Sequence, residues 1–184
     1  MKLKAMLDYS LVTQASEQEL KLLVRLQAPK SGARQRKPLN LGVVIDRSGS
    51  MAGHKIENVK RALKTLITHL GSGDYLSLVQ FDDAVQVLFE PQPVKNKDAL
   101  KQLVDRIETG GSTNLSGGWL ESLRLLGKKV GPDRISRCLL LTDGQANVGI
   151  QDTGQLAELG KSARKEFNIV TTTLGFGETS MRIC

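Results

Sequence analysis

The chain has 184 residues, of which 40% are hydrophobic and 24% are charged, and its formal net charge at pH 7 is +7. This length suits one main domain with a substantial core, and no apolar run is long enough to span a membrane. Asp8, Tyr9 and Ser10 interrupt the N-terminal segment, so we expect no signal peptide. The two cysteines, Cys138 and Cys184, make no disulfide framework, and we expect free thiols in a cytoplasmic protein.

The positive charge does not by itself predict a nucleic-acid partner. The basic residues are scattered, and their densest cluster, Lys30–Lys37, is interleaved with Ser, Gly and Pro. Aromatic residues make up only 4% of the sequence, which does not favour a stacking platform for single strands. We interpret the basic residues as parts of solvated helix faces and of a basic loop. Such a surface would favour an acidic protein partner, and we expect no nucleic-acid binding.

The N-terminal part predicts a small β structure. Residues 3–13 and 18–28 read as two strands, because apolar and polar residues alternate through much of the second segment. Their short connection predicts an antiparallel hairpin. Pro29–Asn40 is polar and basic, as expected of a linker. We therefore divide the chain into a hairpin with its basic linker, residues 1–38, and a second domain, residues 39–184.

The second domain predicts alternating strands and helices. Leu41–Ile45 is a continuous apolar run, typical of a strand covered on both faces. A helix over residues 54–70 carries apolar residues at spacings of three and four, with Lys55 on its polar face. The further predicted elements are strands at Tyr75–Phe81 and Val85–Phe89, a helix at Asp98–Ile107, a helix after Gly110–Thr113, a strand at Ile135–Leu141, a helix at 153–166 and a strand at Ile169–Leu174. This alternation predicts a mostly parallel α/β sheet.

Polar residues with oxygen-bearing side chains follow three of these segments. Asp46, Ser48 and Ser50 form an Asp-x-Ser-x-Ser pattern directly after Leu41–Ile45. Thr113 ends a Gly-rich loop, and Asp143 follows another apolar run. Loops at the carboxyl ends of parallel strands meet at one edge of a sheet, so we expect these side chains to converge.

The chemistry of this set predicts a site for a hard divalent cation. The hydroxyls of Ser48, Ser50 and Thr113 are candidate ligands, while Asp46 and Asp143 supply charge either directly or through bound water. Neutral hydroxyls compensate a dication poorly, so such a site would accept an outside carboxylate. Mg²⁺ is the expected ion because it keeps waters and takes octahedral oxygen ligands; Mn²⁺ is the first alternative and Ca²⁺ is less favoured.

These residues resemble the von Willebrand factor type A family, also called the integrin I-like family. The segment Asp46–Ser50 matches the family's Asp-x-Ser-x-Ser motif, Thr113 matches its loop threonine, and Asp143 matches its second aspartate. The resemblance runs from about Leu41 to about Gly177 and is closest to the bacterial intracellular branch, which often carries a short β segment ahead of the domain.

The resemblance implies a doubly wound, Rossmann-like sheet with helices on both faces and a metal-ion-dependent adhesion site. Ser48, Ser50 and Thr113 would be direct ligands, and Asp46 and Asp143 would bind mostly through water. Family members are generally not enzymes, and an acidic side chain of a protein partner can complete the metal sphere. We therefore expect a Mg²⁺-dependent protein-binding module.

The resemblance also predicts elements beyond the last strand. The family fold normally continues after Ile169–Leu174 with one more helix and an edge strand, and Gly175–Cys184 is too short for both. We expect either a C-terminally truncated domain or elements supplied by a partner. An uncovered sheet edge would also favour self-association.

Alternatives remain beside this prediction. One is an assembly scaffold in which the metal site is not essential. Another is a Mg²⁺-dependent phosphohydrolase with Asp46 as nucleophile, although Ser48 stands where such chemistry usually has a second carboxylate. Asp82 and Asp83 read as a charged hairpin turn rather than a second cation site, and His54 reads as an exposed helix residue.

Overall fold

The computed structural model describes residues 2–7, 21–27, 36–144, 148–150 and 152–176. Its chain divides into two compact units, Met1–Arg36 and Lys37–Cys184. Across the described part of the chain, no helix has both the length and the apolar character that crossing a membrane requires. The expectations for the segment after Phe176 lie outside the described residues.

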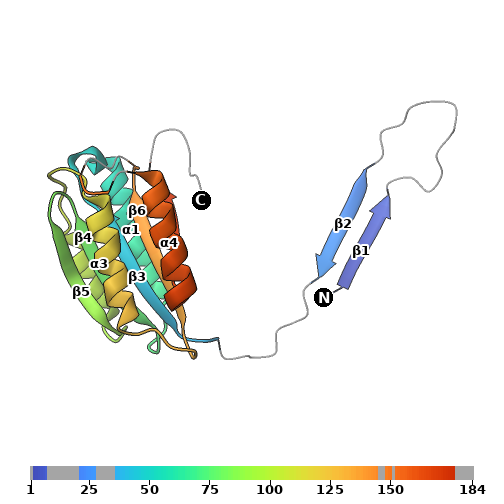
Figure 1. The fold of residues 1–184 in the computed structure, drawn as a ribbon. Coiled ribbons are helices and arrows are strands. Elements are labelled where there is room, and N and C mark those ends of the chain that lie inside the picture. The colour runs from blue at the N-terminus through green and yellow to red at the C-terminus, as the bar shows by residue number, and fades with distance from the viewer. Residues whose placement is uncertain (1, 8–20, 28–35, 145–147, 151, 177–184) are drawn as a thin grey trace, which may run out of the picture. The chain divides into compact units, whose positions relative to one another are not determined.

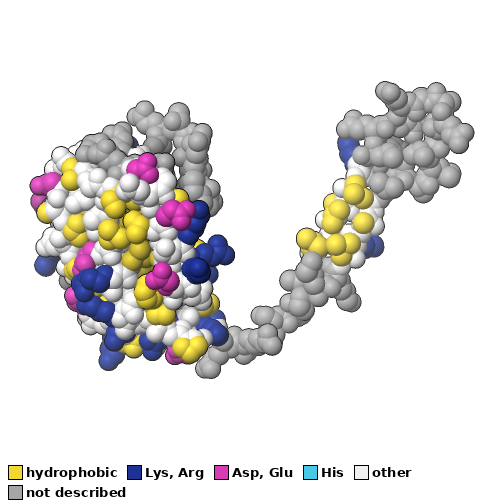
Figure 2. Space-filling view, viewed as in Figure 1, with side chains coloured by type: hydrophobic (Ala, Val, Ile, Leu, Met, Phe, Trp, Pro, Cys, Tyr) yellow, Lys and Arg dark blue, Asp and Glu magenta, His cyan; other side chains and the backbone are white. Residues whose placement is uncertain are grey.

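The first unit contains an antiparallel pair of strands, β1 (Lys2–Leu7) and β2 (Leu22–Gln27). The predicted strands extend further, over residues 8–13, 18–20 and 28, which lie outside the described part. Side chains alternate between the faces of a strand, so the pairs Leu3–Leu26 and Ala5–Val24 lie on one face. Leu3 and Leu26 are 65% and 60% exposed, and Figure 2 shows hydrophobic side chains along this pair of strands.

The second unit contains a five-stranded sheet in the order β5-β4-β3-β6-β7. The strands are β3 (Leu39–Asp46), β4 (Tyr75–Phe81), β5 (Val85–Pro93), β6 (Ile135–Thr142) and β7 (Val170–Gly175). The helices are α1 (His54–His69), α2 (Lys97–Asp105), α3 (Leu115–Gly127) and α4 (Thr153–Phe167), with a 3₁₀ turn, η1 (Gly49–Met51). All neighbouring strands run parallel except β4 and β5. The mostly parallel α/β fold is confirmed.

Helices cover both faces of this sheet (Figure 1). Leu41, Val43 and Ile45 of β3 belong to a core that includes α1 and α2. Val44 belongs to the opposite core, with Trp119 of α3. The two-residue period of a strand thus explains the continuous apolar run, because each face of β3 has its own helical layer.

The helix α1 matches its predicted stripe. Ile56, Val59, Leu63 and Ile67 are all buried against the sheet. In contrast, β5 is longer than predicted, because it pairs along β4 as far as Pro93, opposite Tyr75.

The α3 helix approaches the sheet closely at two glycines. A Cβ atom at Gly42 would lie 2.5 Å from Ser122 Oγ, and one at Gly118 would lie 2.5 Å from Phe81 Cδ1. Neither position has room for a larger residue without movement of the helix. Gly118 lies in the first turns of α3, which begins directly after the loop with Thr113, so this packing also fixes where that loop enters the helix.

Candidate metal centre

The predicted site residues meet at the carboxyl edge of the sheet. Asp46 is the last residue of β3, and Thr142 is the last residue of the neighbouring β6. The 3₁₀ turn η1 follows β3, and Asp143 follows β6. Parallel strands therefore bring residues almost a hundred positions apart to one place, as the sequence predicted.

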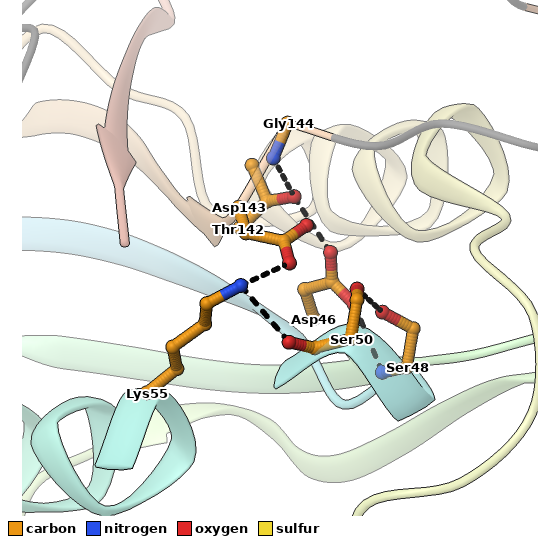
Figure 3. Close-up of polar contacts among 7 residues, drawn as sticks. All are labelled: Asp46, Ser48, Ser50, Lys55, Thr142, Asp143 and Gly144. Carbon is orange, nitrogen blue, oxygen red and sulfur yellow. Dashed lines mark hydrogen bonds and ion pairs between the residues drawn. The ribbon is translucent and has the colours of Figure 1, made fainter. Parts of the chain in front are cut away.

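The turn after β3 brings two hydroxyls together. The backbone N–H of Ser48 donates to Asp46 Oδ1 at 2.9 Å, which holds the turn in a tight bend. Ser48 Oγ and Ser50 Oγ then lie 3.1 Å apart (Figure 3). Asp46 and Ser48 are both buried, and Met51, also buried, packs into the core.

The Gly-rich loop with Thr113 is bonded to this turn through its backbone. Gly110 N–H donates to the Arg47 carbonyl at 2.8 Å, and Gly49 N–H donates to the Gly111 carbonyl at 3.1 Å. Gly111 has a φ of 63°, a left-handed conformation that suits glycine. Thr113 is 1% exposed. The loop that carries the third predicted hydroxyl is thus fixed beside the first two.

Two residues that the sequence analysis did not single out complete the polar network. Thr142 Oγ1 donates to Asp46 Oδ2 at 2.6 Å and accepts from the N–H of Gly144 at 3.0 Å. Lys55 Nζ lies 2.9 Å from Asp143 Oδ2 and donates to the Ser50 carbonyl at 3.0 Å. The helical periodicity of the sequence places Lys55 only on the polar face of its helix. Its position just after the Asp-x-Ser-x-Ser turn was the available signal.

An ion pair between Arg47 and Asp82 joins three loops around the site. Arg47 Nη2 lies 2.5 Å from Asp82 Oδ2, and Arg47 Nη1 donates to the Glu108 carbonyl at 3.2 Å. Asp82 also accepts from the N–H of Ala84 through Oδ1, so the predicted charged turn between β4 and β5 is present. The backbone carbonyl of Asp82 accepts from Asn114 N–H, next to Thr113. Arg47 and Asp82 therefore position the site without belonging to the predicted ligand set.

The donor set fits a small hard cation. Mg²⁺ binds oxygen at about 2.0–2.1 Å in octahedral geometry, so two neighbouring ligands lie about 3 Å apart. The 3.1 Å between Ser48 Oγ and Ser50 Oγ corresponds to such an edge. Asp46 uses both oxygens inside the protein, with Ser48 N–H and Thr142 Oγ1 as donors, which suits a role through bound water. His54 is exposed on α1, as expected.

Comparison with known proteins agrees with this fold. Residues 40–182 match the family model of the von Willebrand factor type A domain. An uncharacterised protein of Synechocystis, sll0103, is 33% identical over 171 residues, which cover 93% of this chain and 40% of that protein. The chain thus spans well under half of the length of this relative.

Solved structures of other proteins are similar to this chain in fold. A von Willebrand factor type A protein from Catenulispora acidiphila is 25% identical, with a TM-score of 0.63 over 77% of this chain and 34% of that one. Proximal thread matrix protein 1 from the mussel byssus is similar in fold, with a TM-score of 0.62 and 20% identity. The match covers 75% of this chain and 38% of that one. That structure has zinc in its metal-ion-dependent adhesion site (MIDAS) motif. The chain described here belongs to the von Willebrand factor type A domain family.

Proposed function

We propose that this chain is a metal-dependent protein-interaction module whose cation is held by Ser48, Ser50 and Thr113, with Asp46 and Asp143 supplying negative charge. The observation that carries the proposal is the 3.1 Å approach of the Ser48 and Ser50 hydroxyls beside a buried carboxylate. The type A family is one of metal-dependent protein interaction, and a bound ion with an open position would accept an acidic side chain of a partner.

Mg²⁺ is the proposed ion, with Mn²⁺ as the first alternative and Ca²⁺ as a weaker one. The zinc-occupied motif of the mussel protein shows that a MIDAS motif holds a divalent ion in that relative. Here the candidate ligands are hydroxyl and carboxylate oxygens, which suit Mg²⁺ better than zinc. We also propose a cytoplasmic location, for which the buried free thiol of Cys138 is the support, and a bacterial source, which rests on the resemblance of the sequence to the bacterial intracellular branch.

A binding role without catalysis is part of the proposal. Asp46 is fully buried, and both of its oxygens accept hydrogen bonds, from Ser48 N–H and Thr142 Oγ1. A nucleophile needs a free oxygen aimed at its substrate, so this arrangement does not favour the phosphohydrolase alternative. Turnover of a phosphate ester that disappears in Asp46→Asn would support that alternative instead.

A second candidate function is assembly independent of the metal. The observation that favours it is the exposed apolar face of the β1–β2 pair, where Leu3, Leu22 and Leu26 are each at least 60% exposed. Partner binding or self-association that survives chelation of divalent ions would support this scaffold function, including pairing through a sheet edge.

Titration calorimetry of Mg²⁺ and Mn²⁺ tests the main proposal. We expect saturable binding at one site in the unaltered chain and its loss in Ser48→Ala and Thr113→Ala. Ser112→Ala is the matched control, because Ser112 is exposed beside the buried Thr113. Circular dichroism must show that each variant is folded. A folded chain that binds neither ion, or that binds equally well as Ser48→Ala, would contradict the proposal.

A further inference from the structure

A positive side chain of the protein itself lies in the candidate metal centre. Lys55, in the first turn of α1, places its ammonium 2.9 Å from Asp143 Oδ2 and 3.0 Å from the Ser50 carbonyl oxygen. Figure 3 shows the ammonium between these two oxygens, which belong to two of the proposed ligand residues. The side chain of Asp143 is 2% exposed, whereas that of Lys55 is 31% exposed.

The ammonium changes the charge balance of the site. Asp46 and Asp143 carry two negative charges, and Lys55 compensates one of them. A dication bound here would then leave the site with one net positive charge. Without Lys55, the two carboxylates would neutralise the dication by themselves. Because Asp46 and Asp143 are largely shielded from water, these charges interact more strongly than they would on an open surface.

The ammonium also keeps a donor available. A lysine ammonium has three N–H donors, and the residues that the structure describes use two of them, through Asp143 and the Ser50 carbonyl. Because the side chain of Lys55 is 31% exposed, we expect an outside group to reach the third donor. A partner carboxylate at the metal would therefore find a second positive group beside it.

We propose that Lys55 is a built-in counter-cation that weakens binding of the metal alone and couples it to the arrival of a carboxylate. This inference rests on the proposed metal-dependent function. Repulsion from the ammonium lowers the affinity for the dication, and the carboxylate of the partner removes the excess positive charge. Binding of metal and carboxylate then favour each other, and by linkage the coupling is the same in both directions.

Binding of Mn²⁺ alone tests the first half of the inference. Free Mn²⁺ is measured by electron paramagnetic resonance during titration of the unaltered chain, Lys55→Met and Lys55→Gln. We expect both variants to bind Mn²⁺ at least about threefold more tightly, because one nearby positive charge is gone. Lys60→Met is the matched control, since Lys60 lies on the same helix but pairs with Glu57 at 3.1 Å. It should leave the affinity unchanged.

Acetate as a model carboxylate tests the second half. At equal ionic strength, replacing chloride by acetate should tighten Mn²⁺ binding to the unaltered chain and to Lys60→Met, after correction for acetate binding of free Mn²⁺. The effect should be smaller in Lys55→Met. The acetate effect should be reduced equally in Lys55→Gln, which would show that the lost charge, and not the shape of the new side chain, is the cause.

The outcomes separate the two proposals. Equal or weaker Mn²⁺ binding by folded Lys55 variants would show that Lys55 only connects α1 to the site. That result would overturn the counter-cation role of Lys55 and would leave the proposed metal site standing. Equal acetate effects in all variants would also overturn the coupling. Binding of Mn²⁺ by neither the unaltered chain nor the Lys55 variants would overturn the proposed function itself, and the inference with it.

Discussion

Thr142 at the end of β6 donates a 2.6 Å hydrogen bond to Oδ2 of Asp46 at the end of β3. The two residues are 96 positions apart in the sequence, and the parallel pairing of β3 with β6 brings them together. Gly144 N–H donates in turn to Thr142 Oγ1, so the hydroxyl acts as donor and acceptor at once. Thr142 therefore fixes which way the buried Asp46 carboxylate faces.

Thr142→Val should weaken both the fold and the proposed metal site. It leaves a buried carboxylate oxygen without its donor, which costs about 1–3 kcal/mol of unfolding free energy. Misorientation of Asp46 should lower Mn²⁺ affinity about tenfold, as loss of an outer hydrogen-bond partner does at other metal sites. Urea unfolding and Mn²⁺ titration measure the two effects. Thr142→Ser keeps the hydroxyl and should behave like the unaltered chain. Identical behaviour of the Val and Ser variants would contradict a role of the Thr142 hydroxyl in orienting Asp46.

Arg47→Met should loosen the loops around the site. Asp82 is 6% exposed at its side chain and would lose its ion-pair partner, while the Glu108 carbonyl would lose a donor. Because the Arg47 side chain is 26% exposed, we expect a loss of about 1–3 kcal/mol, less than for a fully buried pair. Chemical denaturation measures it, and a double-mutant cycle with Asp82→Asn isolates the pair.

The control for this prediction is another arginine ion pair. Arg124 lies 2.6 Å from Glu121 on the surface of α3, and its side chain is 57% exposed. Arg124→Met should cost clearly less stability than Arg47→Met, as is usual for exposed pairs. If the two arginine variants lose equal stability, Arg47 has no special role in holding the loops.

Gly42→Ala should be destabilising because α3 leaves no room on β3. The added Cβ would lie 2.5 Å from Ser122 Oγ and 3.0 Å from Leu126, so helix or strand must move at a cost of about 1–3 kcal/mol. Thermal or urea unfolding gives the value. Gly73→Ala serves as the comparison, since no atom lies within 4 Å of its added Cβ. Adding Ser122→Ala to Gly42→Ala should restore part of the loss, and no recovery would mean that the clash lies elsewhere.

Cys138 should be unreactive in the folded protein. Burial raises the pKa of its thiol to about 11 from an ordinary value of 9.0. In a Cys184→Ser background, alkylation by iodoacetate at pH 8 should therefore be at least about tenfold slower in the native than in the urea-unfolded chain. Equal rates in native and unfolded protein would show that the thiol is accessible.

The same pKa shift predicts a loss of stability at high pH. The folded state holds the thiol proton more tightly, so the unfolded state releases it first as the pH rises above 9. The contribution of Cys138 is complete below that pH and is lost as the pH approaches 11. Cys138→Ala should flatten this part of the stability profile measured by urea unfolding, and an unchanged slope would contradict the assignment.

The sequence by itself determined the layers of the domain and the ends of most elements. A continuous apolar run for β3 and an apolar stripe for α1 are local patterns, set by how many faces each element buries. The order of strands and helices also placed Asp46, Ser48 and Ser50 at a strand end, where the structure has them. The metal-ligand roles of these residues stay predictions.

Only the tertiary structure decided which distant groups meet there. Lys55 looked like any polar residue of a surface helix, yet its ammonium reaches Asp143, 88 positions away. Thr142 lies at the end of an apolar strand, and nothing local shows that its hydroxyl faces Asp46. These contacts depend on β3 lying between β4 and β6, with α1 starting beside the strand ends. The periodicity of apolar residues along the chain indicates which side of an element is buried. The order of strands in the sheet determines which other element that side contacts.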